Sequence, residues 1–325
     1  MRRRDFIKGI GGAAAAWPLA ARAQQMMPVI GHLYAGTPEQ SVSLLSAFRQ
    51  ALAENGYVEG RNVAIEYRFA NNDASLLPDL AADLVSLRVA LIAAAPTIAA
   101  RAAKAATADI PIVFGIGGDP VDVGLVASLN RPGGNATGVT EMNNDLGAKR
   151  LGLLHELLPK AQRFGVLVSR NTLIMQPQVN DLESAAAAIG CRVDVFATGS
   201  NSEIDAAFAA LVQARVEGLL VSPEPLFTSR RTQLVTLAAR HAIPAIYPFR
   251  EDAAAGGLMS YGSSLTDRSR QMGIYTARIL KGEKPAELPV ARAVRFEFVI
   301  NQHAARLLSI AVPATLLALA DEVIE

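Results

Sequence analysis

The chain has 325 residues, of which 51% are hydrophobic, and a formal net charge of +1. Residues 1–23 hold five basic residues and Asp5, so the rest of the chain carries a formal charge of −3, which does not favour nucleic-acid binding because that function needs a clustered positive face. The single cysteine, Cys191, excludes an internal disulfide, and the length exceeds that of a usual single domain, so we expect two domains.

The N-terminal segment has the three parts of an export signal. Basic residues at 2–4 precede an apolar Gly/Ala stretch, which leads to an Ala-x-Ala sequence ending at Ala23. The Arg-Arg-x-Phe-Ile-Lys order ending at Lys8 fits a twin-arginine signal. A membrane anchor is less favoured, because the apolar run is shorter than the ~20 residues of a spanning helix. We therefore expect residues 1–23 to be a twin-arginine-type signal peptide cleaved near Ala23, and the mature protein to be periplasmic.

From Pro28 onward, short β-branched runs alternate with amphipathic helical stretches. This alternation predicts a parallel sheet covered by helices on both faces. The strands expected in the first half cover residues 29–34, 63–69, 89–93 and 110–114, with helices over 44–52, 77–87 and 97–107 between them. The pair Asn55-Gly56 predicts the end of the first helix, because glycine adopts the left-handed conformation at low cost.

After residues 136–140 the same cycle starts again. The strands expected in the second half cover residues 164–169, 192–196, 218–222, 244–247 and 257–262. The architecture recurs as two successive Rossmann-like halves, and in such a layout a ligand binds at the carboxyl ends of the strands, between the lobes. Polar, glycine-containing stretches at 141–147 and 262–266 predict crossovers between the lobes.

Motifs of several enzyme classes are incomplete or missing from the sequence. A Gly-x-Gly-Gly run at 115–118 follows a strand, but the first strand ends without the three-glycine spacing of a dinucleotide site. No Walker-type Gly-Lys-Ser/Thr, Gly-x-Ser-x-Gly or His-Glu-x-x-His sequence occurs, and the four histidines are isolated, so we expect no metal site. An exported oxidoreductase or hydrolase on a doubly wound fold stays open as the alternative, and so does a sensory receptor.

A series of motifs matches one known family in order along the chain. They are NGYVEGRN at 55–62, IEYR at 65–68, SLNRPGGNATG at 128–138, GGLMSYG at 256–262 and ADEVIE at 320–325. Together they resemble the ABC transporter substrate-binding family that includes tryptophan- and tyrosine-type receptors. The resemblance implies an α/β, type I periplasmic binding protein: two Rossmann-like lobes with parallel sheets, joined by three crossover segments. The first lobe would cover 28–142 plus 264–290, and the second 143–263 plus 291–325.

The resemblance also implies a function. The protein would be the periplasmic substrate-binding component of an ABC importer, with no cofactor and no catalytic turnover. It would capture a small solute by closure of the lobes, and the solute would be an amino acid, often aromatic, or a related carboxylate. Its partners would be this small-molecule ligand and an ABC permease in the inner membrane, with no nucleic acid, and we expect the protein to be a monomer.

An amino-acid ligand needs donors for its carboxylate and acceptors for its ammonium group in a largely dry cleft. Thr97 matches the family's threonine at the start of the third helix, although Pro-Thr-Ile stands here for the usual Gly-Thr-Pro. Asp119 is the matching acidic residue of the first lobe, with a helix N-cap as the open alternative. In the second lobe, Glu224 is the candidate for the ammonium group and Asn171 for a polar clamp. Arg170 is either a carboxylate ligand or an exposed surface arginine.

Aromatic side chains near strand ends could line the same site. Tyr34, Tyr247 and Tyr261 are placed where their rings could enclose an apolar or aromatic side chain, and core packing is the open alternative for each. The predicted ligand-binding set is therefore Tyr34, Thr97, Asp119, Asn171, Glu224, Tyr247 and Tyr261.

Overall fold

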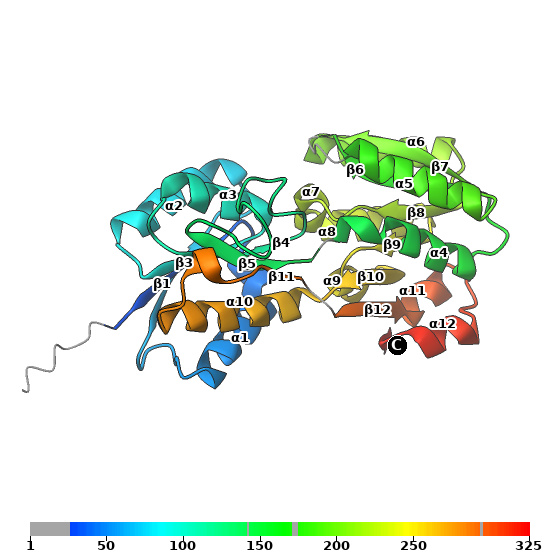
Figure 1. Ribbon diagram of the computed structural model, residues 1–325. Helices are drawn as coiled ribbons and strands as arrows, with labels where there is room; N and C mark the ends of the chain where they lie inside the picture. The colour runs from blue at the N-terminus through cyan, green and yellow to red at the C-terminus, as the bar shows by residue number, and fades with distance from the viewer. Residues whose placement is uncertain (1–26, 142, 171–174, 293–294) are drawn as a thin grey trace, which may run out of the picture.

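The computed structural model describes residues 27–141, 143–170, 175–292 and 295–325. The predicted signal peptide and Asn171 therefore lie outside the described residues. Within those residues the chain forms two α/β lobes that lie side by side (Figure 1). Among them, no helix combines the length and apolar character needed to cross a membrane.

The first lobe is built on a six-stranded sheet of order β11-β5-β4-β3-β1-β2, counted over the described part of the chain. Its strands are β1 (Val29–Tyr34), β2 (Ala64–Phe69), β3 (Leu91–Ala95), β4 (Ile112–Ile116), β5 (Ala136–Thr140) and β11 (Ala291–Arg292). Every residue of β3, β4 and β5 is buried, as expected for parallel strands covered on both faces. β3 and β4 begin two residues later than predicted.

Two pairs of helices cover the two faces of the first sheet. They are α1 (Pro38–Glu54) with α10 (Leu265–Leu280), and α2 (Leu77–Ser86) with α3 (Thr97–Ala106). Phe48 of α1 and Met272 of α10 pack on one face, and Leu84 of α2 and Ala103 of α3 on the other. α10 thus belongs to the first lobe although it follows most of the second lobe in the sequence (Figure 1).

The second lobe repeats the arrangement on a seven-stranded sheet of order β13-β12-β10-β9-β8-β6-β7, again within the described residues. Its strands are β6 (Arg163–Ser169), β7 (Arg192–Thr198), β8 (Gly218–Val221), β9 (Ala245–Tyr247), β10 (Met259–Ser263), β12 (Phe296–Asn301) and β13 (Glu322–Ile324). Its helices are α4 (Gly147–Leu157), α5 (Met175–Ala188), α6 (Asn201–Gln213), α7 (Pro225–Ser229), α8 (Arg231–Arg240), α9 (Arg250–Ala254), α11 (Gln302–Leu307) and α12 (Ala314–Leu319). Across both lobes, the short 3-10 helices are η1 (Ala74–Leu76), η2 (Asn143–Leu146) and η3 (Pro285–Glu287).

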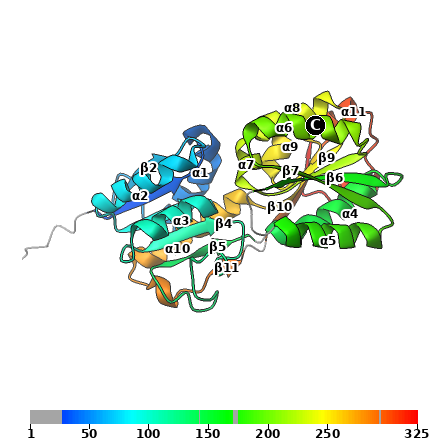
Figure 2. The same ribbon diagram turned by 90° about the horizontal axis from the view of Figure 1, so that it is seen from above.

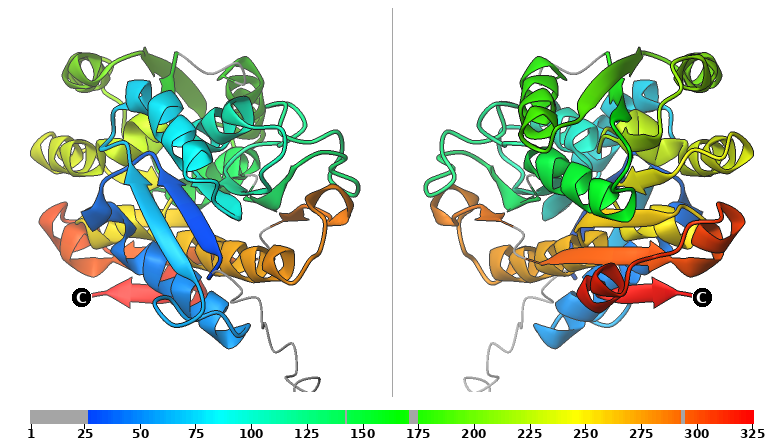
Figure 3. Two further views of the ribbon diagram at one scale, coloured as in Figure 1. Left: turned by 90° about the vertical axis from the view of Figure 1, so that its left-hand side faces the viewer. Right: turned by 90° about the vertical axis from the view of Figure 1, so that its right-hand side faces the viewer.

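The two faces of the second sheet are also covered by helices. α4, α5, α11 and α12 pack on one face, and α6, α7 and α8 on the other. Viewed end-on, the C-terminal strand β13 lies at the outer edge of this lobe (Figure 3). The predicted α/β fold with two Rossmann-like lobes is confirmed.

Among the described strands, two depart from the predicted parallel arrangement: β12 pairs antiparallel with β10, and β13 runs parallel to β12. β10 ends at Ser263, where the chain leaves the second lobe, and β12 begins at Phe296, where it returns, and these two residues are paired. A strand that enters beside the exit of its neighbour must run in the opposite direction.

Three segments connect the lobes, after β5, after β10 and after β11 (Figure 2). β11 pairs with β5, so the first sheet continues two residues past the predicted boundary at 290. The first two crossings are tied together, because Asn143 Oδ1 accepts hydrogen bonds from Ser263 N and Ser263 Oγ, each at 3.0 Å. A buried ion pair between Glu141 and Arg268, with 3.3 Å between Oε2 and Nη1, lies at the same junction.

Candidate functional site

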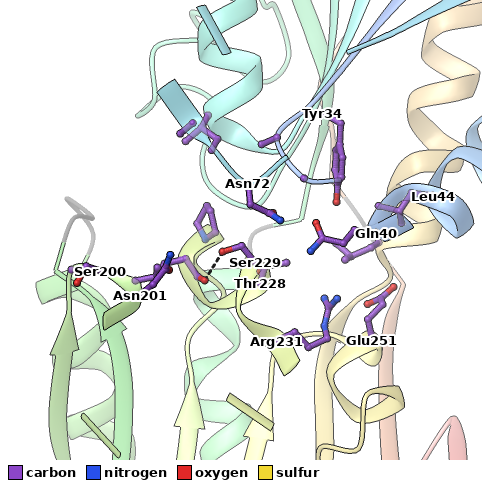
Figure 4. A pocket seen from close by; sticks show the side chains of 18 residues that line it. Tyr34, Gln40, Leu44, Asn72, Ser200, Asn201, Thr228, Ser229, Arg231 and Glu251 are labelled. Atoms are coloured by element: carbon purple, nitrogen blue, oxygen red, sulfur yellow. Dashed lines mark hydrogen bonds between the residues drawn. The ribbon is translucent and has the colours of Figure 1, made fainter. Parts of the chain in front are cut away.

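A cavity of about 380 Å³ lies between the two lobes (Figure 4). Its first-lobe lining comes from Tyr34, Ala35, Gly36, Gln40, Leu44, Asn72, Ala74 and Ile98. Its second-lobe lining comes from Gly199, Ser200, Asn201, Pro225, Leu226, Thr228, Ser229, Arg231 and Glu251, with Leu265 at the crossover.

The position of this cavity follows from the strand order of each sheet. In both lobes the first strand lies between the second and the third, in the orders β2-β1-β3 and β7-β6-β8. The connections that follow the first and the third strand run in opposite directions from this point. Their divergence opens a crevice outside the carboxyl ends of the strands. Segments that follow β1, β3, β7 and β8 all contribute to the cavity lining.

Tyr34, Gln40 and Asn72 form the polar part of the first-lobe wall. Tyr34 ends β1, and Gln40 lies in the first turn of α1, where its Oε1 accepts the N–H of the capping residue Thr37 at 3.1 Å. The amide nitrogen of Gln40 is left as a donor. Asn72 has a φ of 64°, a left-handed conformation that asparagine tolerates. Figure 4 shows Tyr34 and Asn72 pointing from this lobe into the cavity.

Arg231 supplies the positive charge of the second-lobe wall. Its Nε donates to Asp252 Oδ1 at 2.7 Å, and the same carboxylate accepts the backbone N–H of Phe249 at 3.1 Å. Burial raises the pKa of Asp252 to about 6, although Arg231 opposes the shift, so this carboxylate is ionised at neutral pH. Because Asp252 holds one edge of the guanidinium group, Arg231 is fixed with its other donors toward the cavity (Figure 4).

Glu251 supplies a negative charge next to Arg231. Its Oε2 atom is buried and has no hydrogen-bond partner among the described residues. Within the same residues, Arg231 pairs with Asp252 and not with Glu251. The cavity therefore presents a cation and an anion that do not neutralise each other, which is the arrangement that a zwitterion would satisfy.

Two hydroxyl groups of the second-lobe wall, those of Thr228 and Ser229, are already used as donors. Thr228 Oγ1 donates to the backbone oxygen of Glu224 at 3.3 Å, and Ser229 Oγ donates to that of Leu226 at 2.8 Å. Each hydroxyl oxygen retains its capacity to accept a hydrogen bond. This wall therefore offers acceptors beside the donors of Arg231.

The structure places one residue of the predicted set, Tyr34, in the cavity lining. Thr97 begins α3 immediately before Ile98, which lines the cavity. Asp119 accepts the backbone N–H of Val121 at 2.7 Å, the geometry of a capped turn. Asn171 lies outside the described residues.

The other aromatic candidates are packed against the second-lobe core. Tyr247 is 2% exposed, within the hydrophobic cluster under α6 and α8. Tyr261 stacks on Phe296, with ring centroids 6.2 Å apart, and meets Phe298 edge-on. Neither is brought together with Tyr34 in the cavity lining.

Glu224 is buried directly beside the cavity. Ser222 Oγ donates to its Oε2, and its Oε1 has no partner among the described residues. Burial raises the pKa of Glu224 to about 7, while the hydrogen bond from Ser222 opposes the rise. The carboxyl group is thus close to half-protonated at neutral pH, next to lining residues Pro225 and Leu226.

Gln40, Asn72, Arg231 and Glu251 were not predicted from the sequence. Apart from Thr97 at the start of α3, the prediction considered residues at strand ends and in the loops after them. Gln40, Arg231 and Glu251 instead lie in the first turns of α1, α8 and α9. A signal was present in the acidic pair Glu251-Asp252, which begins four residues after the predicted strand 244–247. Among the described residues, no group of acidic, histidine or cysteine side chains could hold a metal ion.

The profile of the family described as "ABC transporter substrate binding protein" matches residues 41–324. The chain belongs to this family. A curated relative, the "Tyrosine-binding protein" of Clostridioides difficile (strain R20291), is 31% identical over 256 residues, which cover 78% of this chain and 73% of the relative. The sequence-based assignment to the ABC transporter substrate-binding family is therefore confirmed.

Two solved structures are similar to this one over most of the chain. A Streptococcus pneumoniae ABC domain in complex with L-Trp has 27% identity and a TM-score of 0.82, covering 91% of this chain and 99% of its own. The ligand-free, open structure of a Clostridium difficile substrate-binding protein has 27% identity and a TM-score of 0.67, covering 88% of this chain and 96% of its own.

Proposed function

We propose that this substrate-binding protein captures an amino acid, with an aromatic side chain, in the cavity between its lobes. The observation that carries the proposal is the separate placement of Arg231 and Glu251 on one wall of the cavity. The guanidinium group would receive the ligand's carboxylate and Glu251 its ammonium group. Asp252 holds the guanidinium group before binding, so little ordering cost is added at Arg231 when the ligand enters.

The side chain of the ligand would lie against the apolar part of the same cavity. Tyr34 and Leu44 from the first lobe and Leu226 from the second offer an aromatic ring and two aliphatic surfaces. Tyrosine and tryptophan fit this environment because each combines a flat apolar ring with a polar group. The names of the two relatives, one tyrosine-binding and one bound to L-Trp, support the same class of ligand.

We further propose that the protein works outside the inner membrane and delivers its ligand to an ABC permease by closing around it. The similarity in lobe arrangement supports closure: the TM-score is 0.82 against the L-Trp complex and 0.67 against the ligand-free, open relative, at the same 27% identity. Closure is driven only by contacts that the ligand makes better in the closed state. A ligand that joins Arg231 on one lobe to Gln40 or Asn72 on the other meets that condition.

Calorimetric titration of the mature protein with L-tyrosine and L-tryptophan tests the proposal. We expect saturable binding, and Arg231→Gln should weaken it at least about tenfold, because a hydrogen bond to a charged group is worth about 1.5–3 kcal/mol. The matched control is Arg230→Gln, which removes the same charge from the exposed neighbour outside the cavity and should leave affinity unchanged. Absence of binding to any amino acid, or equal losses in the two variants, would contradict the proposal.

A further inference from the structure

A second cavity, of about 310 Å³, lies inside the second lobe between helices α4 and α5 and the face of strands β6 and β8. It shares no lining residue with the cavity between the lobes. Val166, Val168, Leu182 and Leu220 form its apolar walls, and Arg150 and Gln178 are among its polar lining residues. Its volume is at the lower end of the range of small-molecule sites, which are apolar clefts with a few polar groups.

Arg150 is a buried cation in this cavity. Only 2% of the residue is exposed, and its Nε and Nη2 donate to the backbone oxygens of Tyr261 and Asn143 at 2.7 and 3.3 Å. No carboxylate of the described residues lies within ion-pair distance of it. Burial lowers the pKa of Arg150 to about 10, so the group stays charged at neutral pH. The carboxylates of Asp252 and Glu224 oppose this shift from beyond contact distance, and the direct hydrogen-bond partners of Arg150 are neutral. A buried guanidinium group without a direct ionic partner is costly, and an anion beside it would remove part of that cost.

The side-chain amide of Gln178, on α5, also lacks a partner. Its Nε2 and Oε1 atoms are both buried and make no hydrogen bond within the described part of the chain. Buried amides almost always have partners, so an amide with both polar atoms unsatisfied in a cavity wall indicates a site for a hydrogen-bonding ligand. Arg150 and Gln178 line the cavity from different helices, α4 and α5, and a ligand bound between them would accept hydrogen bonds from both.

We propose that this second cavity binds a small monocarboxylate with an apolar body. The carboxylate would lie at Arg150 and Gln178, and the apolar body would pack against Val166, Val168 and Leu220 of the sheet. The exposed carboxylate of Asp181 at the rim disfavours a second negative charge on the guest. The site is separate from the one proposed for the amino acid, and neither proposal depends on the other.

The test uses 4-fluorophenylacetate as the probe, followed by fluorine NMR and calorimetry on the mature protein, with neutral 2-(4-fluorophenyl)ethanol as the comparison. We expect the anion to bind at least about tenfold more tightly than the alcohol, because it alone forms charge-assisted hydrogen bonds. Arg150→Gln should remove most of that preference. Ala148→Trp, at an exposed lining position on α4, should block both probes and leave the hydrogen bonds of Arg150 to Tyr261 and Asn143 in place.

A matched pair of charge variants on α5 sharpens the test. Asp181→Asn removes the negative charge at the rim and should tighten binding of the anion by about twofold or more, whereas Glu183→Gln, exposed and outside the lining, should not. Probe binding that survives Ala148→Trp and is lost in Arg231→Gln would place the probe between the lobes and overturn the proposal. Failure of 4-fluorophenylacetate to bind would overturn it as well, and leaves amino-acid binding in the other cavity unaffected.

Discussion

Glu224 lies between the two cavities. Ser222 and Pro223, before it, line the cavity inside the second lobe, and Pro225 and Leu226, after it, line the cavity between the lobes. Its buried carboxyl group has a pKa raised to about 7 from the ordinary 4.5. In the unfolded chain the same group ionises near 4.5, so the folded protein binds more protons between these two values. Folding stability must then fall as the pH rises across that interval.

We predict that Glu224→Gln removes this pH dependence. The unfolding free energy of the variant relative to the unaltered protein should increase between pH 5 and pH 8, by up to about 3 kcal/mol, because the cost of a buried ionised carboxylate is absent. Urea unfolding at the two pH values measures the difference. The exposed Glu183→Gln is the control and should track the unaltered protein; a Glu224→Gln difference that does not change with pH would contradict the assignment.

Only part of the cavity lining could be predicted from the sequence. The part that was missed depends on contacts between residues that are far apart along the chain. Tyr34 was found because a strand end can be recognised from its own β-branched run. Arg231 was not, because its role depends on Asp252, 21 residues later, which holds its guanidinium group. Tyr247 and Tyr261 satisfied the same strand-end rule as Tyr34, and only the packing of α8 and β12 distinguishes their surroundings from those of the cavity.

Helices α1 and α10 show how one glycine controls the approach of two elements. A Cβ atom on Gly273 of α10 would lie 2.5 Å from the backbone oxygen of Phe48 and 2.8 Å from the Cβ of Ala51, both on α1. Real Cβ atoms do not approach so closely, so any side chain at 273 must separate the helices. This contact holds α10 on the first lobe immediately after the chain has crossed from the second.

We predict that Gly273→Ala destabilises the protein by about 1–3 kcal/mol, the usual cost of overpacking. Gly152→Ala provides the opposite case, because Gly152 is exposed on α4 with no atom near its would-be Cβ, and alanine is favoured over glycine in helices by about 0.5–1 kcal/mol. Urea unfolding should show the two variants moving in opposite directions. A neutral or stabilising Gly273→Ala would mean that the helices can separate freely.

At the element scale, the strands with continuous apolar runs were predicted to within two residues at each end, and β12 was not predicted. Its sequence, Phe296–Asn301, alternates polar and apolar residues only at its start, and it lies beyond the last crossing. Its direction is set by the place where the chain re-enters the second lobe, beside Ser263. Such information is topological and is absent from any local pattern of residues.

At the scale of the whole molecule, the proposed function requires the lobes to change their separation. We predict that a saturating amino-acid ligand lowers the radius of gyration measured by small-angle X-ray scattering, because the ligand joins the two walls of the cavity. Arg231→Gln at the same ligand concentration should keep the larger radius. A radius that does not change for the unaltered protein, under conditions in which calorimetry shows saturation, would contradict closure.

The route of the chain between the lobes has a consequence for how the protein is made. A ribosome that has delivered the chain through β10 has produced the central strands of both sheets, but α10 and β11, which complete the first lobe, have yet to be synthesised. The second lobe in turn waits for β12 and β13. Neither lobe can mature as a unit in the order of translation, and a stop codon placed anywhere before β11 would leave both unfinished rather than releasing one intact lobe.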